Sequence, residues 1–226
     1  MSVKITPKTL FLQDDLTSVD LEHYRQSGIV AVDCEMTGLN PHRDVLCLVQ
    51  MCSADGYVRL VKTHDWRESA GLKAFFQDAQ VLKIFHFAIM DCGFILKSLG
   101  VEVQNVFCTK IASKLARTYT GEHSLMSLVK ELMGVEMNKS EQSTFWLSDK
   151  LTEKQLSYAA HDVTYLIEAR ELLLAMLHKK GDLPTGISYI ELNQYCQNFI
   201  PTLVQLWING WDFGREEKSA LAIFGR

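Results

Sequence analysis

The chain has 226 residues, of which 47% are hydrophobic, and a formal net charge of −4. This length and composition are sufficient for one substantial hydrophobic core and exclude a disordered chain. The negative charge argues against a strongly basic surface that would hold a long nucleic acid along its backbone.

The first third of the chain predicts strands in succession. Residues 9–12 are a candidate edge strand, and residues 20–26 predict a short helix or turn. Three apolar runs bounded by turn residues predict strands: 29–32, 45–52 and 57–61. Ala54-Asp55-Gly56 predicts a hairpin turn between the last two. The chain is therefore expected to begin with three antiparallel strands.

Strand and helix patterns alternate after residue 66, where apolar residues first recur at helical spacing. Candidate strands at 81–87 and 101–107 are each followed by a candidate helix, at 88–99 and 109–115. This alternation is typical of parallel strands joined by crossover helices. The later helices are predicted at 124–133, 152–180 and 189–209, the last bent or interrupted at Pro201. The predicted fold class is α/β, with a mixed sheet and a helical C-terminal part.

The cysteines and the apolar runs indicate the cellular compartment of the protein. The six cysteines include no C-x-x-C pair and no zinc-ligand spacing, which is typical of reduced core residues in a cytoplasmic protein. Residues 1–16 lack the apolar core of a signal peptide, and no apolar run is long enough to span a bilayer. We therefore expect a cytoplasmic protein with no membrane partner.

Two acids, Asp33 and Glu35, follow the apolar run 29–32. Side chains two residues apart on a strand point to the same face, so these carboxylates are expected to lie together. At about 4 Å and an effective dielectric of about 20, their repulsion is on the order of 4 kcal/mol. A hard divalent cation would balance it. The alternative is an exposed strand end with solvated acids.

Two later helices carry further acids. Asp91 falls near the first turn of its helix, where the helix dipole alone also favours an acid. Thr152 begins a capping-box pattern, which places Tyr158 and Asp162 one turn apart on one helix face. A carboxylate held among packed side chains is costly unless a cation meets it. Otherwise Asp162 reaches solvent and Tyr158 is a packing residue.

Three motifs occur in order along the chain: VDCEMTGL, FHFAIMD and YAAHD. With the stretches GLNPHRDVLCLVQ, KIFHF, VFCTKIASKLARTYT and KSEQS, they cover about residues 28 to 170. On these residues the sequence resembles the ribonuclease D-like enzymes of the tyrosine branch of the DEDD exonuclease superfamily, and within it the short nano-RNase C type. It departs from them at Ser143-Thr144-Phe145-Trp146, where S-D-W is common, and at Ala88-Ile89-Met90, where a basic residue often stands.

The resemblance implies a ribonuclease H-like fold, with an exonuclease domain over residues 1–180. Residues 181–226 would be a C-terminal helix and tail that pack on the same domain or on a neighbouring subunit. The four acids Asp33, Glu35, Asp91 and Asp162 would hold two Mg²⁺ or Mn²⁺ ions, about 3.5 to 4 Å apart. Tyr158 would orient or deprotonate the attacking water.

The implied activity is 3′-to-5′ hydrolysis of very short RNA, dinucleotides above all, to nucleoside 5′-monophosphates by a homo-octamer. Two alternatives stay open. The substrate could be DNA, because none of the motifs reads the 2′-hydroxyl, or the chain could be a catalytically inactive nucleic-acid-binding or assembly subunit. The intact catalytic positions weigh against the second alternative.

Seven further residues are candidate substrate contacts. Leu39 follows the metal acids and is placed to wedge against a base. His86 and Phe87 precede Asp91 and are placed to stack on a base or contact a phosphate. The basic candidates for phosphate are Arg43, Lys110, Lys114 and Arg117. A solvated basic face explains the last three equally well.

Sixty-four residues follow Asp162, and the predicted helices use most of them. We therefore expect no additional helical RNA-binding domain. Since backbone affinity grows with the number of phosphates neutralised, we expect the binding energy to come mostly from the two nucleotides that flank the scissile bond. The apolar residues 221–224 are a candidate contact with a neighbouring subunit.

Overall fold

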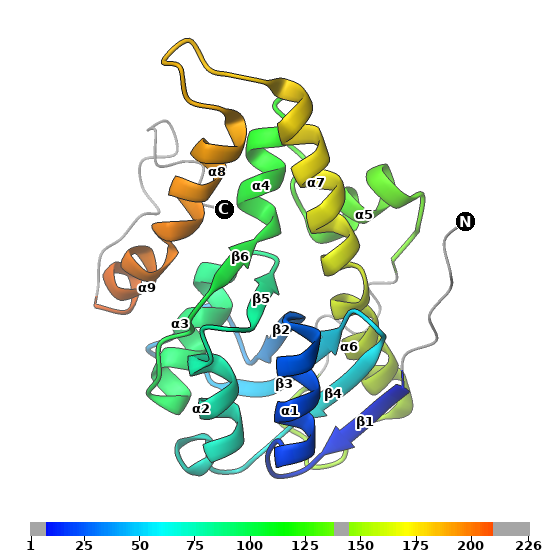
Figure 1. Ribbon diagram of the computed structural model, residues 1–226. Coiled ribbons are helices and arrows are strands. Elements are labelled where there is room, and N and C mark those ends of the chain that lie inside the picture. Colours follow the sequence, from blue (N-terminus) through cyan, green and yellow to red (C-terminus); the bar gives the residue numbers. More distant parts are fainter. Residues whose placement is uncertain (1–7, 138–144, 210–226) are drawn as a thin grey trace.

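The computed structural model describes residues 8–137 and 145–209 (Figure 1). This part of the chain forms a six-stranded sheet in the order β1-β4-β3-β2-β5-β6. The strands are β1 (Lys8–Leu12), β2 (Ile29–Met36), β3 (Leu46–Ser53), β4 (Tyr57–Val61), β5 (Leu82–Phe85) and β6 (Val106–Cys108). The helices are α1 (Ser18–Ser27), the short η1 (Trp66–Glu68), α2 (Ala70–Gln77), α3 (Ala88–Leu99), α4 (Thr109–Ala116), α5 (Leu125–Met133), α6 (Glu153–Thr164), α7 (Leu166–Lys180), α8 (Tyr189–Asn198) and α9 (Ile200–Ile208).

The sheet is mixed, as the sequence predicts. Strands β2, β3 and β4 are antiparallel, whereas β5 and β6 extend the sheet in parallel from β2. Strand β1 is the edge strand and pairs in parallel with β4. The α/β fold class is therefore confirmed, with helices on both faces and a helical C-terminal part.

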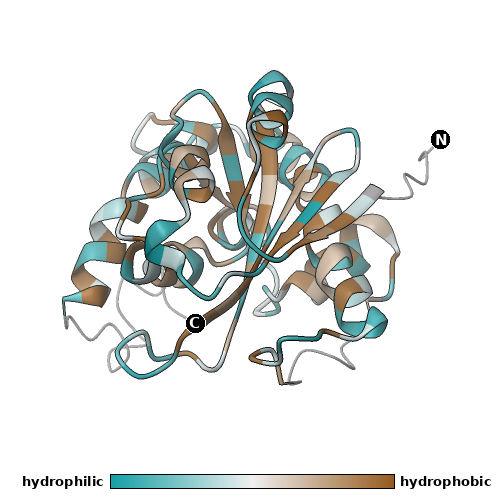
Figure 2. Cartoon of the chain, turned by 90° about the horizontal axis from the view of Figure 1, so that it is seen from below, coloured by the Kyte–Doolittle hydropathy of each residue, from teal (hydrophilic) through white to brown (hydrophobic). Residues whose placement is uncertain are grey.

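The central strand β2 presents alternate residues to two helical layers. Val32 lies opposite Met51 of β3, and both are fully buried. Asp33 lies opposite Gln50 and, one residue along the strand, points to the other face. Helix α6 packs against β2, β3 and β4, and α1 packs against β2. Figure 2 shows the brown, apolar strands of the sheet lying between helices on both sides.

The predicted helix over 152–180 is wrong in one respect, because the structure has two helices there, α6 and α7. They meet at Tyr165, where no side chain caps the second helix. The hydroxyl of Thr164 donates to the carbonyl oxygen of Ala160 at 2.8 Å, a contact that bends helices. The joint falls directly after Asp162 and therefore sets where that acid sits relative to α7.

Two other predicted boundaries shift for local reasons. The strand predicted over 101–107 forms only in β6, because Asn105 has a positive φ of 54° and interrupts the extended backbone. The predicted helix 189–209 divides at Phe199 rather than at Pro201. Proline lacks a donor and is tolerated in the first turn of a helix, where α9 places it.

The described C-terminal helices pack on the same domain. Gln197 of α8 donates to the carbonyl oxygen of Cys108 and accepts from its backbone N–H. Gly93 of α3 leaves room for Trp207 of α9, because a Cβ at Gly93 would lie 2.3 Å from the indole ring. Residues 221–224, the candidate contact with a neighbour, lie outside the described residues.

The cysteines and helices agree with the features expected for them. All six cysteines lie in the described ranges and are free and buried. None of the helices formed by residues 8–137 and 145–209 is both long and apolar enough to cross a membrane.

Candidate active site

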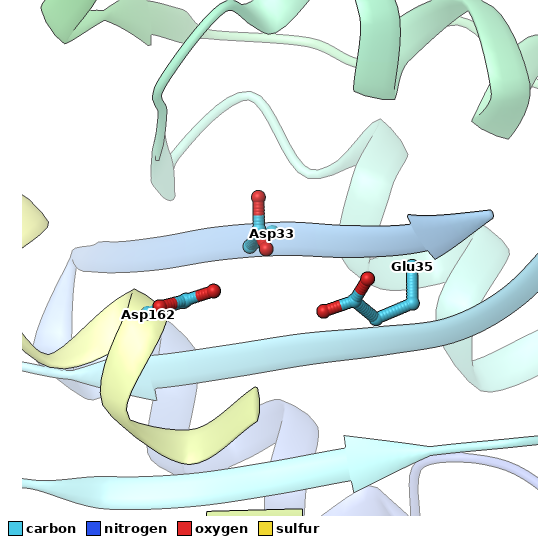
Figure 3. A group of neighbouring side chains, drawn as sticks. All are labelled: Asp33, Glu35 and Asp162. Atoms are coloured by element: carbon cyan, nitrogen blue, oxygen red, sulfur yellow. The ribbon is translucent and has the colours of Figure 1, made fainter. Parts of the chain in front are cut away.

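Three carboxylates converge on the face of the sheet that α6 covers. Asp33 and Glu35 come from β2, and Asp162 comes from α6. One carboxylate oxygen of each lies within 4.8 Å of the others. Figure 3 shows the three side chains directed toward a common space. The two-residue spacing on β2 thus brings its acids together as predicted, and α6 adds a third acid from 127 residues further along the chain.

The fourth acid, Asp91, lies near Asp33 and Cys34 but is not one of this group of three. It occupies the first turn of α3 and is 4% exposed. The backbone N–H and the thiol of Cys34 donate to its carboxylate. Burial and then the charge of Asp33 raise the pKa of Asp91 well above its usual range. The charge of Asp33 therefore acts both on the clustered acids and on Asp91.

Burial and mutual repulsion raise the pKa values of the clustered acids. Burial and then Asp162 raise the pKa of Asp33 to about 8, and burial and then Asp33 raise that of Glu35 to about 10. Burial raises the pKa of Asp162 to about 6, against the lowering effect of its hydrogen bond with Tyr158. None of the ion pairs within the described ranges includes these acids.

The donor set fits a hard divalent cation. Mg²⁺ and Mn²⁺ prefer carboxylate oxygens, and this site offers clustered oxygens from three carboxylates, with the carboxylate of Asp91 near Asp33. The pKa values of Asp33 and Glu35 are raised first by burial and then by repulsion from the neighbouring acids, and a bound cation would offset both effects. A structural ion pair would instead have brought a lysine or arginine to these acids.

Tyr158 lies one turn before Asp162 on α6 and shares a hydrogen bond with it. The predicted capping box is present, with Thr152 and Gln155 exchanging hydrogen bonds at the start of the helix. Burial and then Asp162 raise the pKa of Tyr158 above its usual range, so the hydroxyl keeps its proton and is a donor in the metal-free protein. The ring of Trp146 lies 6.2 Å from that of Tyr158 and is 3% exposed.

His86 and Phe87 shape the start of α3. Nε2 of His86 donates to the carbonyl oxygen of His123 at 3.0 Å, and Nδ1 lies 2.9 Å from the hydroxyl oxygen of Thr109. Burial, with the nearby charge of Lys110, lowers the pKa of His86 to about 3, so the ring is neutral and both nitrogens have protein partners. Phe87 caps α3 with a positive φ of 78°, and the ammonium of Lys110 lies 4.2 Å from its ring centre.

The three basic residues near α4 that are candidate phosphate contacts differ in their exposure to solvent. Arg117 is 1% exposed, pairs with Glu131, and donates to the hydroxyl of Ser113 and the carbonyl oxygen of Glu122. These contacts close the turn after α4 and engage the guanidinium within the protein. The side chains of Lys110 and Lys114 are partly exposed on the same helix. Of the three, the lysines are therefore better placed to reach a substrate.

Leu39 and Arg43 belong to the loop between β2 and β3. Asp44 holds this loop closed, because its carboxylate accepts from the backbone N–H of Asn40 and from both Nε and Nη2 of Arg43. Gly38 packs so closely that a Cβ there would lie 2.3 Å from an Asp44 oxygen. Leu39 remains 53% exposed on this loop, which follows directly on the strand that carries Asp33 and Glu35.

Two residues beside the site were missed by the sequence reasoning. The carbonyl oxygen Oε1 of Gln50 and the indole Nε1 of Trp146 are buried without a hydrogen-bond partner in the part of the chain that the structure describes. A polar residue inside the apolar strand 46–51 was a usable signal for Gln50. Trp146 gave no such signal, because its contact with Tyr158 depends on how an irregular segment folds back onto α6.

Comparisons with known proteins identify the family of this chain. A family model described as 3′–5′ exonuclease matches residues 9–178. Ribonuclease D of Gluconacetobacter diazotrophicus is 29% identical over 201 residues, which cover 89% of this chain and 51% of that protein. The chain spans about half the length of the curated relatives it matches.

Two solved structures of Brucella melitensis NrnC are similar over nearly their whole length. NrnC bound to pGG is 36% identical with a TM-score of 0.82, and the match covers 92% of this chain and 98% of that one. NrnC with bound Mg²⁺ is 35% identical with a TM-score of 0.81, and the match covers 91% of this chain and 98% of that one. The resemblance to ribonuclease D-like proteins and to the nano-RNase C type is thereby confirmed.

Proposed function

The chain belongs to the 3′–5′ exonuclease family, and we propose that it hydrolyses very short RNA, dinucleotides above all, from the 3′ end to nucleoside 5′-monophosphates. The observation that carries the proposal is the acid cluster: three carboxylate oxygens within 4.8 Å of one another, with no ion-pair partner in the described ranges, beside a tyrosine hydroxyl. A cluster of this kind is suited to cation-assisted phosphodiester hydrolysis.

We assign four acids to two Mg²⁺ or Mn²⁺ ions. Asp33, Glu35, Asp91 and Asp162 would hold them, because three of these acids are clustered and the fourth, Asp91, lies near enough to Asp33 for their charges to interact. When bound, the ions lower the pKa of the attacking water and stabilise the leaving 3′ oxygen. The NrnC structure with bound Mg²⁺ supports the choice of a hard divalent cation.

Tyr158 orients or deprotonates the attacking water in this proposal. Its hydroxyl already shares a hydrogen bond with Asp162, so it stands at the edge of the acid cluster. The buried ring of Trp146 supports the tyrosine ring from the side. No serine, cysteine or histidine nucleophile is required, because water attacks the phosphorus directly.

The substrate is proposed to contact the loop after β2 and the face of α4. Leu39 is exposed on the loop that Asp44 closes, the ammonium of Lys110 lies over the ring of Phe87 at the start of α3, and Lys114 follows one turn further along α4. Arg43 is 75% exposed in its side chain and remains a phosphate candidate. We give His86 and Arg117 supporting roles instead, because their polar groups are engaged within the protein.

The short length of the substrate rests on charge and on similarity. The net charge of −4 leaves little to attract each additional phosphate of a long RNA. The similar NrnC structure is bound to pGG, a dinucleotide. We further propose a cytoplasmic homo-octamer, with an exonuclease domain over residues 1–180 and a C-terminal part over 181–226; the family match over 9–178 supports that boundary.

Graded substrates test the proposal. The protein is incubated with 5′-phosphorylated RNA and DNA of two and about ten nucleotides, with Mg²⁺ or with EDTA. We expect cleavage of the RNA dinucleotide, abolished by EDTA, with kcat/KM at least equal to that for the longer RNA. A preference for DNA would make it a DNA exonuclease, and binding without cleavage would make it an inactive subunit. In a direct competition, a clear preference for the longer RNA would overturn the dinucleotide assignment.

A further inference from the structure

Gln50 is a buried polar residue at the back of the acid cluster. It lies on β3 opposite Asp33 and is fully buried. Its side-chain amide donates to Oε1 of Glu35 at 3.4 Å. Its own Oε1 is buried, and no described residue donates to it. One end of the amide therefore serves a candidate metal ligand, and the other end has no partner among residues 8–137 and 145–209.

This arrangement works against stability. The residues before and after Gln50 on β3, from Leu46 to Met51, are all apolar and buried. An unpaired carbonyl in such a strand costs free energy that an apolar side chain of similar shape would not. A polar side chain kept at such a cost points to a functional requirement.

Gln197 is a buried glutamine with a structural role, and its hydrogen bonds can be compared with those of Gln50. It is 7% exposed on α8, its Oε1 accepts from the backbone N–H of Cys108, and its amide donates to the Cys108 carbonyl and to Asn193. Both ends of this amide are paired, and they fasten α8 to β6. Gln50 has no such task, because β3 is already held by β2 and β4 through backbone hydrogen bonds.

We propose that Gln50 is the positioning residue for Glu35: its amide holds the carboxylate in the orientation that binds a cation, and its free Oε1 accepts a hydrogen bond from water that enters with that cation. This inference rests on the proposed function. Residues hydrogen-bonded to metal-binding side chains fix their orientation and commonly affect affinity as much as a weak ligand does. Mg²⁺ in particular keeps several waters when bound to carboxylates, and those waters need acceptors.

The test compares Gln50→Met with the matched control Gln197→Met. Methionine has nearly the length and shape of glutamine but forms no comparable hydrogen bonds. Mn²⁺ and Mg²⁺ binding are measured by titration calorimetry on the full chain without substrate, and thermal unfolding is measured in EDTA. For Gln50→Met we expect about 10- to 100-fold weaker cation binding and an unchanged or higher Tm. For Gln197→Met we expect a lower Tm and unchanged cation binding.

Each outcome bears on the inference. Cation binding by Gln50→Met within twofold of the unsubstituted protein would overturn it, and so would a Tm loss in EDTA as large as that of Gln197→Met. Gln50→Leu serves as a second variant, and failure of both Gln50 variants to fold would make Gln50 a structural residue. If the unsubstituted protein bound no cation, the proposed function itself would be wrong. If the unsubstituted protein and Gln50→Met bound the cation equally well, only the inference about Gln50 would be wrong. Raising Mg²⁺ should also restore turnover of Gln50→Met, which a damaged fold would not allow.

Discussion

Asp20 and Glu35 are both buried acids, but the chain surrounds them in opposite ways. Asp20, 3% exposed on α1, receives hydrogen bonds from Thr17, from the hydroxyl of Tyr57 at 2.7 Å and from Nε of Arg59 at 2.7 Å. Burial alone would raise its pKa, but these donors together lower it to about 2. Glu35, 9% exposed on β2, has acids beside it, and burial with Asp33 raises its pKa to about 10.

The contrast between Asp20 and Glu35 shows that this fold surrounds a buried structural carboxylate with hydrogen-bond donors and a positive charge. At Asp20 an arginine, a tyrosine and a helix cap meet the same acid. At Glu35 the sole donor given by a described side chain is the amide of Gln50. We therefore infer that the balancing charge at Glu35 comes from outside the chain, as a bound cation.

The largest expected effect comes from Glu35→Gln. It removes a cation ligand, so turnover should fall by at least about 10⁴-fold, or about 5.4 kcal/mol of transition-state stabilisation. Because it also removes like-charge repulsion, Tm in EDTA should hold or rise. Single-turnover cleavage of a dinucleotide and thermal unfolding measure the two effects. Turnover by Glu35→Gln near that of the unsubstituted protein would contradict the proposed two-cation site.

The next effect is that of Tyr158→Phe, which removes the hydroxyl beside Asp162. Loss of a positioned proton-transfer group should lower kcat by roughly 10²- to 10⁴-fold, or about 3 to 5 kcal/mol, with little change in KM. Steady-state kinetics on a dinucleotide separate the two constants. A change confined to KM would instead make Tyr158 a packing or stacking residue.

Asp20→Asn is the counterpart of Glu35→Gln at the balanced acid. It leaves Arg59 buried without its partner and weakens the cap of α1, so we expect a loss of about 3 kcal/mol in unfolding free energy. Denaturant unfolding in EDTA measures it. Turnover of the folded fraction should stay normal. If Asp20→Asn and Glu35→Gln changed stability in the same direction, the contrast between the two acids would be wrong.

Adding Mg²⁺ should stabilise the unsubstituted protein, because the cation binds the folded acid cluster and not the unfolded chain. At 100 times the dissociation constant the gain is about 2.7 kcal/mol. Thermal unfolding across a Mg²⁺ series, with NaCl matched for ionic strength as the control, measures the shift. The same series on Glu35→Gln should give a much smaller one. Equal shifts in both proteins would point to a general salt effect.

The last prediction concerns how stability in EDTA depends on pH between pH 6 and 8. The folded pKa of Glu35 is raised to about 10 and that of Asp33 to about 8, above their unfolded values, so the folded state holds more protons in this window. Stability without metal should therefore fall as pH rises from 6 to 8. Asp20, with its pKa lowered to about 2, contributes nothing to that slope and loses its contribution only toward pH 2. Glu35→Gln should flatten the slope, and a stability that rose with pH would contradict the raised pKa values of Asp33 and Glu35.

Local patterns in the sequence were sufficient to predict most of the strands and helices of the fold. Alternation and apolar runs predicted the strands β2, β3 and β4 and their antiparallel order, and the alternation of strand and helix predicted the parallel extension through β5 and β6. The errors occurred where one residue changed the backbone. The hydroxyl of Thr164 lies where the long helix divides, and the positive φ of Asn105 delays the predicted strand until Val106.

By itself, the sequence determined which side chains on one element share a face, because the periods of strands and helices are fixed by backbone geometry. That was sufficient to pair Asp33 with Glu35 and Tyr158 with Asp162. Only the tertiary structure decided what each charged group faces, because partners such as Glu131 for Arg117 and His123 for His86 come from other elements. The same holds for Gln50, whose amide reaches Glu35 across two paired strands while its oxygen is left without a partner among the described residues.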